Sequence, residues 1–164
     1  MNVQQARQLA QRRFDLYPPL NEEQVRAFEA KHEVKLPEEY REFLITAGNG
    51  GAARSVLPRD LFRLGEESEY KGLLSLLNHP FPHTQTYQLE HYAVSEIQGT
   101  IPLLHEGCGY HYNLVVSGQE RGNVWLVDFC SNDMVTPILG EVDNERVGFF
   151  EWLGWWDAFL SRVH

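Results

Sequence analysis

The sequence predicts a single α+β domain in which a mostly antiparallel meander of strands packs against N-terminal helices and one C-terminal helix. Apolar residues recur at helical spacing in the first third of the chain, alternate with other residues between Tyr92 and Leu139, and return to helical spacing near the end. A chain of 164 residues fits one domain, 1–164, and buries roughly 68–70% of its unfolded surface. We therefore expect no need for a stabilising disulfide or metal.

Two helices are expected at the N-terminal end. A thin apolar stripe predicts the first from Val3 to about Phe14, which leaves residues 1–19 the least specified part of the domain. Asn21 is a suitable N-cap, and Gln24 stands three residues later as its capping-box partner. The second helix therefore has a well-defined start.

The stretch LPEEYREFLITAGNGG that follows is the most strongly patterned segment of the chain. Pro37 suits the start of a helix because its missing N–H breaks no hydrogen bond there. Apolar residues then recur at i, i+3, i+4 and i+7, which makes one apolar face. Gly48 is expected to end the helix in the left-handed conformation, and the turn after it contains residues that tolerate positive φ. The residues that define this motif are Leu36, Pro37, Tyr40, Phe43, Leu44, Asn49, Gly50 and Gly51.

The middle of the chain is less regular. Short strands are expected at Arg54–Leu57 and Leu61–Leu64, and a short helix is expected after Gly72. Residues 78–88, NHPFPHTQTYQ, contain two prolines and show no periodicity, which predicts an exposed loop.

Four strands and a final helix are expected in the second half. Short connections make neighbouring strands antiparallel, and the alternation gives the sheet one apolar and one mixed face. A helix is then expected from about Gly148 to Arg162, with an apolar stripe that must pack on the sheet or on the first helices. The predicted strands are Ile101–His105, Tyr110–Val116, Val124–Phe129 and Met134–Leu139.

Negative charge is concentrated in the same half. The chain carries 14 Lys and Arg against 23 Asp and Glu, a net charge of −9. Such a field repels nucleic acid and anionic lipid and speeds encounter with a basic protein, although an acidic surface also serves solubility alone. Between Glu106 and Glu151 the only basic residues are Arg121 and Arg146. The acidic residues of this stretch are Glu106, Glu120, Asp128, Asp133, Glu141, Asp143, Glu145 and Glu151.

Nothing in the sequence indicates export or a membrane. The N-terminus lacks the apolar run of a signal peptide, and no stretch approaches the roughly 18–20 apolar residues of a membrane span. We therefore expect a cytoplasmic protein. Cys108 and Cys130 form neither a disulfide framework nor a CxxC motif, and both are predicted to be reduced thiols.

No pattern predicts a catalytic residue, a metal or a cofactor. The spacing of His79, His83 and His91 matches no zinc frame. The glycines of GNGG and EGCGYH match neither phosphate-binding fingerprint and are turn residues. Among the C-terminal tryptophans, Trp155 is the one expected to be exposed. An enzyme remains only a third hypothesis, which rests on Cys108, Cys130, His105 and His111.

The order of these segments resembles the SUKH superfamily of Smi/Knr-type proteins. The resemblance covers most of Leu20–Leu160 and has two anchors, the Leu-Pro to Asn-Gly-Gly motif above and a strand pair containing Gly109-Tyr110 and Trp125–Asp128. The segment Arg54–Gln88 departs from the family pattern. The resemblance implies an α+β fold. It also implies a role like that of bacterial members, which commonly bind and neutralise polymorphic toxin domains, or of eukaryotic members, which act as regulatory scaffolds.

We therefore expect a non-enzymatic immunity protein that binds a toxin domain, with a basic nuclease as one candidate. The alternative is a regulatory interaction module without a toxin partner, for example in cell-wall or signalling control. The sequence leaves the oligomeric state open between a monomer and a weak dimer. The predicted partner-binding residues are Glu106, Glu120, Asp128, Asp133, Glu141, Asp143, Glu145 and Trp155.

Overall fold

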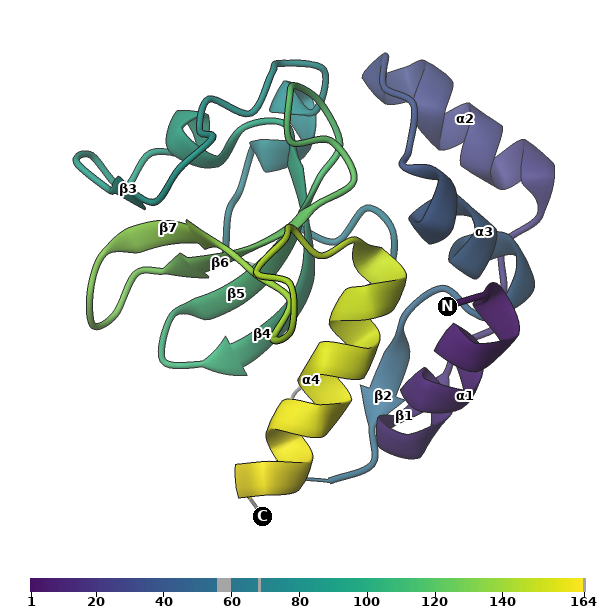
Figure 1. Ribbon diagram of the computed structural model, residues 1–164. Coiled ribbons are helices and arrows are strands. Elements are labelled where there is room, and N and C mark those ends of the chain that lie inside the picture. Colours follow the sequence, from purple (N-terminus) through teal and green to yellow (C-terminus); the bar gives the residue numbers. More distant parts are fainter. Residues whose placement is uncertain (56–59, 68, 164) are drawn as a thin grey trace.

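The computed structural model describes residues 1–55, 60–67 and 69–163, without the side chain of Val163. These residues form the α+β domain that the sequence predicts (Figure 1). The elements are α1 Val3–Arg13, β1 Phe14–Leu16, α2 Glu22–His32, α3 Glu38–Thr46, β2 Gly51–Ala53, the 3₁₀ helix η1 Leu73–Leu76, β3 Tyr87–Gln88, the 3₁₀ helix η2 Val94–Ile97, β4 Thr100–Gly107, β5 Tyr110–Val115, β6 Val124–Asp128, β7 Met134–Pro137 and α4 Phe149–Val163.

The predicted meander is confirmed as four consecutive antiparallel strands, β4 to β7. The two-residue strand β3 extends this sheet beside β7, so that the strand order is β3-β7-β6-β5-β4. A second sheet, which the sequence did not predict, pairs β1 with β2 in antiparallel register from Phe14↔Ala53 to Leu16↔Gly51. Three-residue strands are too short to show a period of two, so no alternation marks them in the sequence.

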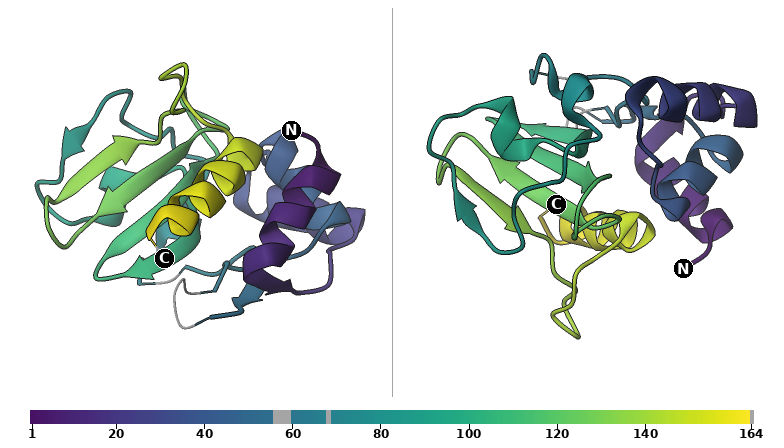
Figure 2. Two further views of the ribbon diagram at one scale, coloured as in Figure 1. Left: turned by 60° about the horizontal axis from the view of Figure 1, so that its bottom comes forward. Right: turned by 90° about the horizontal axis from the view of Figure 1, so that it is seen from above.

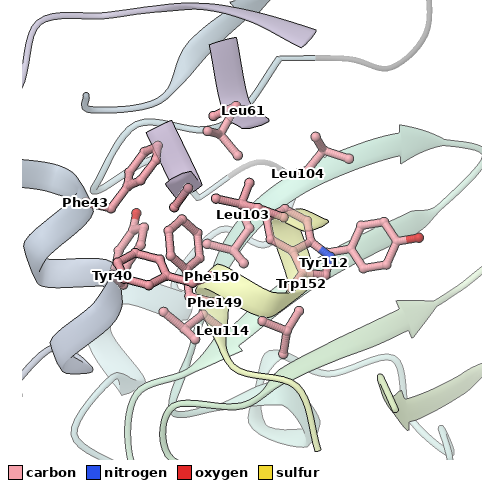
Figure 3. Close-up of a cluster of buried hydrophobic side chains, with 14 of the residues drawn as sticks. Tyr40, Phe43, Leu61, Leu103, Leu104, Tyr112, Leu114, Phe149, Phe150 and Trp152 are labelled. Carbon is pink, nitrogen blue, oxygen red and sulfur yellow. The ribbon is translucent and has the colours of Figure 1, made fainter. Parts of the chain in front are cut away.

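Helix α4 lies between the large sheet and the N-terminal helices (Figure 1). Its Trp152 and Phe149 are buried in a cluster that also contains Tyr112 and Leu114 of β5 and Tyr40 of α3 (Figure 3). The aromatic rings meet edge to face or tilted, with centroids 5.0 Å apart for Tyr40 and Phe149 and 5.5 Å apart for Tyr112 and Trp152. This packing joins both ends of the chain through one core.

An ion pair ties α1, the least specified helix, to α4. Asp157 is buried and accepts hydrogen bonds from Nε of Arg13 at 2.6 Å and from Nη1 of Arg12 at 3.1 Å. Val3, Ala6 and Ala10 are buried as the predicted apolar stripe requires. Although the apolar stripe is thin, α1 is therefore held against α4 both by apolar packing and by the ion pairs of Arg12 and Arg13 with Asp157.

The opposite face of the sheet is covered by the segment that contains η1, β3 and η2 (Figure 2). Most of residues 78–88 are exposed, but Phe81 is buried and its ring lies edge-on to Trp125 at 4.9 Å. The predicted mixed face of the sheet is also buried, since His111 and Asn113 are 0% exposed. This face forms a second, smaller core around Trp125 and Val127.

The motif helix α3 ends at Thr46, without the left-handed glycine that the sequence predicted. Gly48 does not adopt positive φ; it is confined because a Cβ there would lie 2.8 Å from the carbonyl oxygen of Tyr17. Only Gly50 of the following turn is left-handed, with φ of 75° and the carbonyl of Leu61 2.6 Å from the position of a Cβ. Asn49 instead accepts a hydrogen bond from the backbone N–H of Leu64 at 2.8 Å.

The irregular middle of the chain forms less strand than predicted. Arg54 and Ser55 form a bend after β2, and the rest of the predicted strand Arg54–Leu57 lies outside the described residues. Of Leu61–Leu64, Leu61 alone makes isolated bridges, one to Gly51 and one to Leu104. The helix expected after Gly72 is the 3₁₀ helix η1.

Candidate protein-binding groove

The connection between β7 and α4, residues 138–148, projects beside the first turns of α4 (Figure 2). Two backbone hydrogen bonds hold its tip, from Gly140 N–H to the carbonyl of Glu145 at 2.8 Å and from Asn144 N–H to the carbonyl of Gly140 at 3.1 Å. Asn144 has a φ of 59°, which asparagine tolerates better than most residues. The short turn therefore gathers several carboxylates in a small volume.

The carboxylates of this connection face one another and the first turn of α4. A Cβ on Gly140 would lie 2.5 Å from Oδ1 of Asp143 and 3.4 Å from Oε1 of Glu151, so both carboxylates approach the same backbone point. Burial, and then the charges of Asp143, Glu39 and Glu145, raise the pKa of Glu151, and the opposing charge of the N-terminal ammonium group does not cancel them. A raised carboxyl pKa means that the local surroundings disfavour the charged form of Glu151.

An apolar floor lies between these carboxylates. The groove, about 260 Å³ in volume, is lined by Met1, Gly154, Trp155 and Ala158 beside Glu141 and Glu151. Trp155 is half-buried, and its ring stacks on that of Phe159 with centroids 5.7 Å apart and planes 2° from parallel. Phe159 is 40% exposed. We call this surface the acidic groove, with Glu141, Asp143, Glu145 and Glu151 as its rim and Met1, Gly154, Trp155 and Ala158 as its floor.

Arg146 and Arg162, the basic side chains near the connection, are both engaged within the protein. Arg146 donates from Nε to Glu120 at 3.0 Å and from Nη2 to the carbonyl of Thr84 at 2.7 Å, which turns it toward the opposite side of the sheet. Arg162 makes two hydrogen bonds of 2.7 Å with the carboxylate of Glu141, which lower the pKa of that carboxyl. One rim carboxylate is thus paired within the chain.

Glu106 and Glu120, two of the predicted contact residues, accept hydrogen bonds from side chains of the protein itself. Glu106 accepts a hydrogen bond from Nε1 of Trp156 at 2.7 Å. Glu120 is buried against Arg146 and the side-chain amide of Asn123, which donates to it at 3.1 Å. Both carboxylates bind groups of the protein itself and join separate elements of the fold.

Asp128 organises the turn between β6 and β7. Its carboxylate accepts hydrogen bonds from three backbone N–H groups, those of Cys130, Ser131 and Asn132, at 2.9–3.1 Å, and from the side chains of Ser131 and Asn132. Burial acts to raise the pKa of Asp128, but these hydrogen bonds outweigh it and lower the pKa. Asp128 therefore stabilises the turn between β6 and β7.

Asp133 lies in the same turn, at the opposite end of β7 from the connection that forms the groove. It is half-buried with a φ of 51°, and its backbone carbonyl accepts from Leu89 N–H at 2.7 Å. A hydrogen bond to Asp133, and secondarily burial, raise the pKa of the Tyr92 hydroxyl. Of the eight predicted residues, the structure thus brings together Glu141, Asp143, Glu145 and Trp155.

Sequence reasoning missed Glu39, which connects the motif helix to the groove. Its Oε2 accepts a hydrogen bond from the N–H of Phe150 at 3.0 Å, so a side chain of α3 caps the N-terminus of α4. This position favours a carboxylate because the first N–H groups of a helix lack partners within the helix. The sequence signal available was only the Glu38-Glu39 pair in the first turn of α3.

The residues of the enzyme hypothesis are placed apart from the groove. His105 and His111 stack with ring centroids 4.1 Å apart, and the hydroxyl of Tyr70 lies 2.6 Å from Nδ1 of His111. Burial, and then the charge of His105, lower the pKa of His111 to about 4. Among the described residues, no three His, Cys, Asp or Glu side chains are placed to hold a metal ion.

The fold and the groove together define a class of protein, an α+β domain with a surface suited to contact with another protein. The chain matches the model of the SMI1 / KNR4 family (SUKH-1) over residues 19–150 and belongs to that family. The resemblance noted in the sequence is therefore confirmed. No curated protein and no solved structure matches the chain significantly. No helix within the described part of the chain has the length and apolar character to cross a membrane.

Proposed function

We propose that this protein is a non-enzymatic immunity protein that binds and neutralises a cognate polymorphic toxin domain in the bacterial cytosol, with the acidic groove as its contact surface. Family membership supports an immunity or SMI1/KNR4-type protein that acts through protein contacts. The observation that carries the proposal further is the rim of like charges around an apolar floor. Carboxylates that repel one another gain stability when a basic partner arrives.

The two parts of the groove play different roles in binding. The rim carboxylates attract a basic toxin domain, such as a nuclease, and raise the rate of association at low salt. Trp155 of the floor, with the exposed Phe159 stacked on it beside the groove, then provides the apolar area that lengthens the lifetime of the complex, because buried aromatic residues dominate the energy of most interfaces. Neutralisation follows when the bound protein covers the toxin's own substrate surface.

Binding and protection are tested with the toxin domain encoded beside this gene. The proposal expects a complex by size-exclusion chromatography and calorimetry, an association rate that falls as salt is raised, and relief of toxicity when both proteins are expressed together. Absence of a complex at low and moderate salt, with toxicity unrelieved, would overturn the proposal and favour the alternative of a regulatory scaffold.

A further inference from the structure

A second cavity, about 390 Å³ in volume, lies where α1 meets β1, the turn after β1, and the ends of α3 and β2. It shares no lining residue with the acidic groove, and the proposed function leaves it unused. Its volume is within the roughly 300–1,000 Å³ of most small-ligand sites. We call this cavity the arginine pocket, because Arg7 of α1 and Arg54, the residue after β2, both line it.

Arg7 differs in its surroundings from the other two arginines of α1. Arg12 and Arg13 both bind the carboxylate of Asp157. Within the described parts of the chain, by contrast, the guanidinium of Arg7 forms no ion pair and no hydrogen bond, although Arg7 is half-buried. Burial removes part of the hydration of this cation, and a bound anion would compensate for that loss.

The described residues that line the pocket carry one net positive charge. Asp15 is the acidic residue among them, and its Oδ1 lies 2.9 Å from Nε and 2.7 Å from Nη2 of Arg54. Because these two charges cancel, the charge of Arg7 remains. It is a local surplus in a chain whose net charge is −9. One surplus charge matches a carboxylate, which a guanidinium binds through two parallel hydrogen bonds.

The rest of the lining is suited to an apolar group beside the carboxylate. Phe14 and Ala47, which are 0% and 4% exposed, contribute apolar surface. Pro18-Pro19 has no N–H, and the N–H of Tyr17 donates to the carbonyl of Gly50 at 3.0 Å. This wall therefore offers a ligand no backbone donor, and polar contacts are left to side chains.

Contacts within the fold hold the walls of the pocket in place. The N–H of Arg54 donates to the carbonyl of Arg13 at 2.9 Å, which continues the pairing of β1 with β2. The guanidinium of Arg63 lies over the ring of Tyr17, 4.1 Å from its centroid. A preformed site loses little conformational freedom when a ligand binds.

We propose that the arginine pocket binds a carboxylate that is attached to an apolar group. Arg7 pairs with the carboxylate. Gln11, one helical turn later on the same face of α1, donates to it from the side-chain amide, and Phe14 and Ala47 contact the apolar group. Two sources have this chemistry, a free organic acid and the C-terminus of a polypeptide. Neither requires a toxin partner, so the proposal is independent of the function proposed for the acidic groove.

NMR titration of the full ¹⁵N-labelled chain with 3-phenylpropionate tests the proposal. The backbone amide signals of Arg7, Gln11 and Tyr17 should shift until they saturate, while those of the acidic groove should not. The uncharged 3-phenylpropionamide should bind at least about tenfold more weakly, because it cannot form a charge-assisted pair with Arg7. Sodium chloride at equal ionic strength should produce no saturable shift.

A dipeptide distinguishes the two sources of the carboxylate. Acetyl-Gly-Phe with a free C-terminus should bind, and the same peptide with an amidated C-terminus should bind at least about tenfold more weakly. Tighter binding of the free peptide than of 3-phenylpropionate assigns the pocket to a polypeptide C-terminus. The reverse order assigns it to a free organic acid.

Arg7→Gln and Arg26→Gln form a matched pair of variants, since each removes one positive charge from a helix and Arg26 is exposed on α2. Affinity for 3-phenylpropionate should fall at least about tenfold in Arg7→Gln and less than about twofold in Arg26→Gln. Equal effects of the two variants, equal affinities of the acid and its amide, or the absence of saturable shifts would overturn the proposal. The titration of the unsubstituted protein decides the question even if a variant fails to fold.

Discussion

The carboxylates of one stretch of sequence divide into two groups with opposite roles. Glu106, Glu120 and Asp128 each accept hydrogen bonds from the protein itself, from an indole, a guanidinium and a row of backbone N–H groups. Asp143 and Glu151 approach one another beside an apolar floor, and Asp143 accepts a single hydrogen bond, from the N–H of Glu145 at 3.1 Å. Acidic composition alone does not distinguish a carboxylate that stabilises the fold from one that is available to a partner.

The difference has a physical origin in where the residues lie. Strand ends and tight turns leave N–H groups without partners, and a carboxylate placed there lowers the free energy of the folded state. The projecting connection before α4 forms short turns, in one of which Asp143 accepts the N–H of Glu145, and the charges of Asp143 and Glu145 still act on Glu151 and raise its pKa. The first group should therefore affect folding, and the second group should affect binding.

The largest expected effect comes from the scaffold beneath the groove. Leu44→Ala removes a fully buried side chain from α3 and should lower the free energy of unfolding by about 2–5 kcal/mol. Toxin binding should weaken only as far as the folded fraction falls. Urea unfolding measures the first effect, and unchanged stability would show that the packing of α3 is misassigned.

Among the internal carboxylates, Asp128→Ala should be the most damaging. The substitution leaves the backbone N–H groups of Cys130, Ser131 and Asn132 without their shared acceptor, which should cost about 2–4 kcal/mol. Glu145→Ala is the matched change in the groove and should alter stability by no more than about 0.5 kcal/mol. Equal losses in the two variants, measured by chemical denaturation, would remove the distinction between the groups.

Burial of His111 should make the free energy of unfolding depend on pH between about 6.5 and about 4. Its pKa is lowered to about 4 in the folded protein, whereas an unfolded histidine titrates near 6.5. The unfolded state therefore binds the proton first, and stability falls as pH is lowered from about 6.5 to about 4, by on the order of 2–3 kcal/mol.

Denaturation curves recorded between pH 7 and pH 4 check this slope. His111→Gln should flatten it because the substitution removes the group whose pKa is lowered by burial. Below this window the protonation of Asp128 and Glu96, whose pKa values are lowered, should add a further loss. A wild-type slope that persists unchanged in His111→Gln would assign the effect to other groups.

The smallest effect on stability is expected at the groove. Glu151→Gln removes one charge from a cluster that disfavours it, so the free energy of unfolding should stay the same or rise by no more than about 0.5 kcal/mol. Thermal unfolding at neutral pH is the measurement. A clear loss of stability would indicate that Glu151 belongs with the internal carboxylates.

The sequence predicted those features whose signals are local. Asn21 and Gln24 form the capping box from which α2 was located, and period-two alternation predicted β4 to β7. The two-stranded sheet of β1 and β2 was missed because three residues show no period. The roles of Glu106 and Glu120 were missed because their partners, Trp156 and Arg146, lie 50 and 26 residues away in the chain. The groove was predicted only as an acidic stretch, since its apolar floor depends on how α4 packs.

The central claim, that the acidic groove receives a basic partner, is tested by two double variants that change net charge equally. Glu145→Lys with Glu151→Lys reverses the rim, and Glu23→Lys with Glu90→Lys reverses exposed carboxylates of α2 and of the segment after β3. Stopped-flow or surface-binding kinetics with the toxin domain encoded beside the gene, at low salt, should show association slowed by about tenfold or more in the rim variant and by less than about threefold in the control. Equal rates in the two variants would contradict the account.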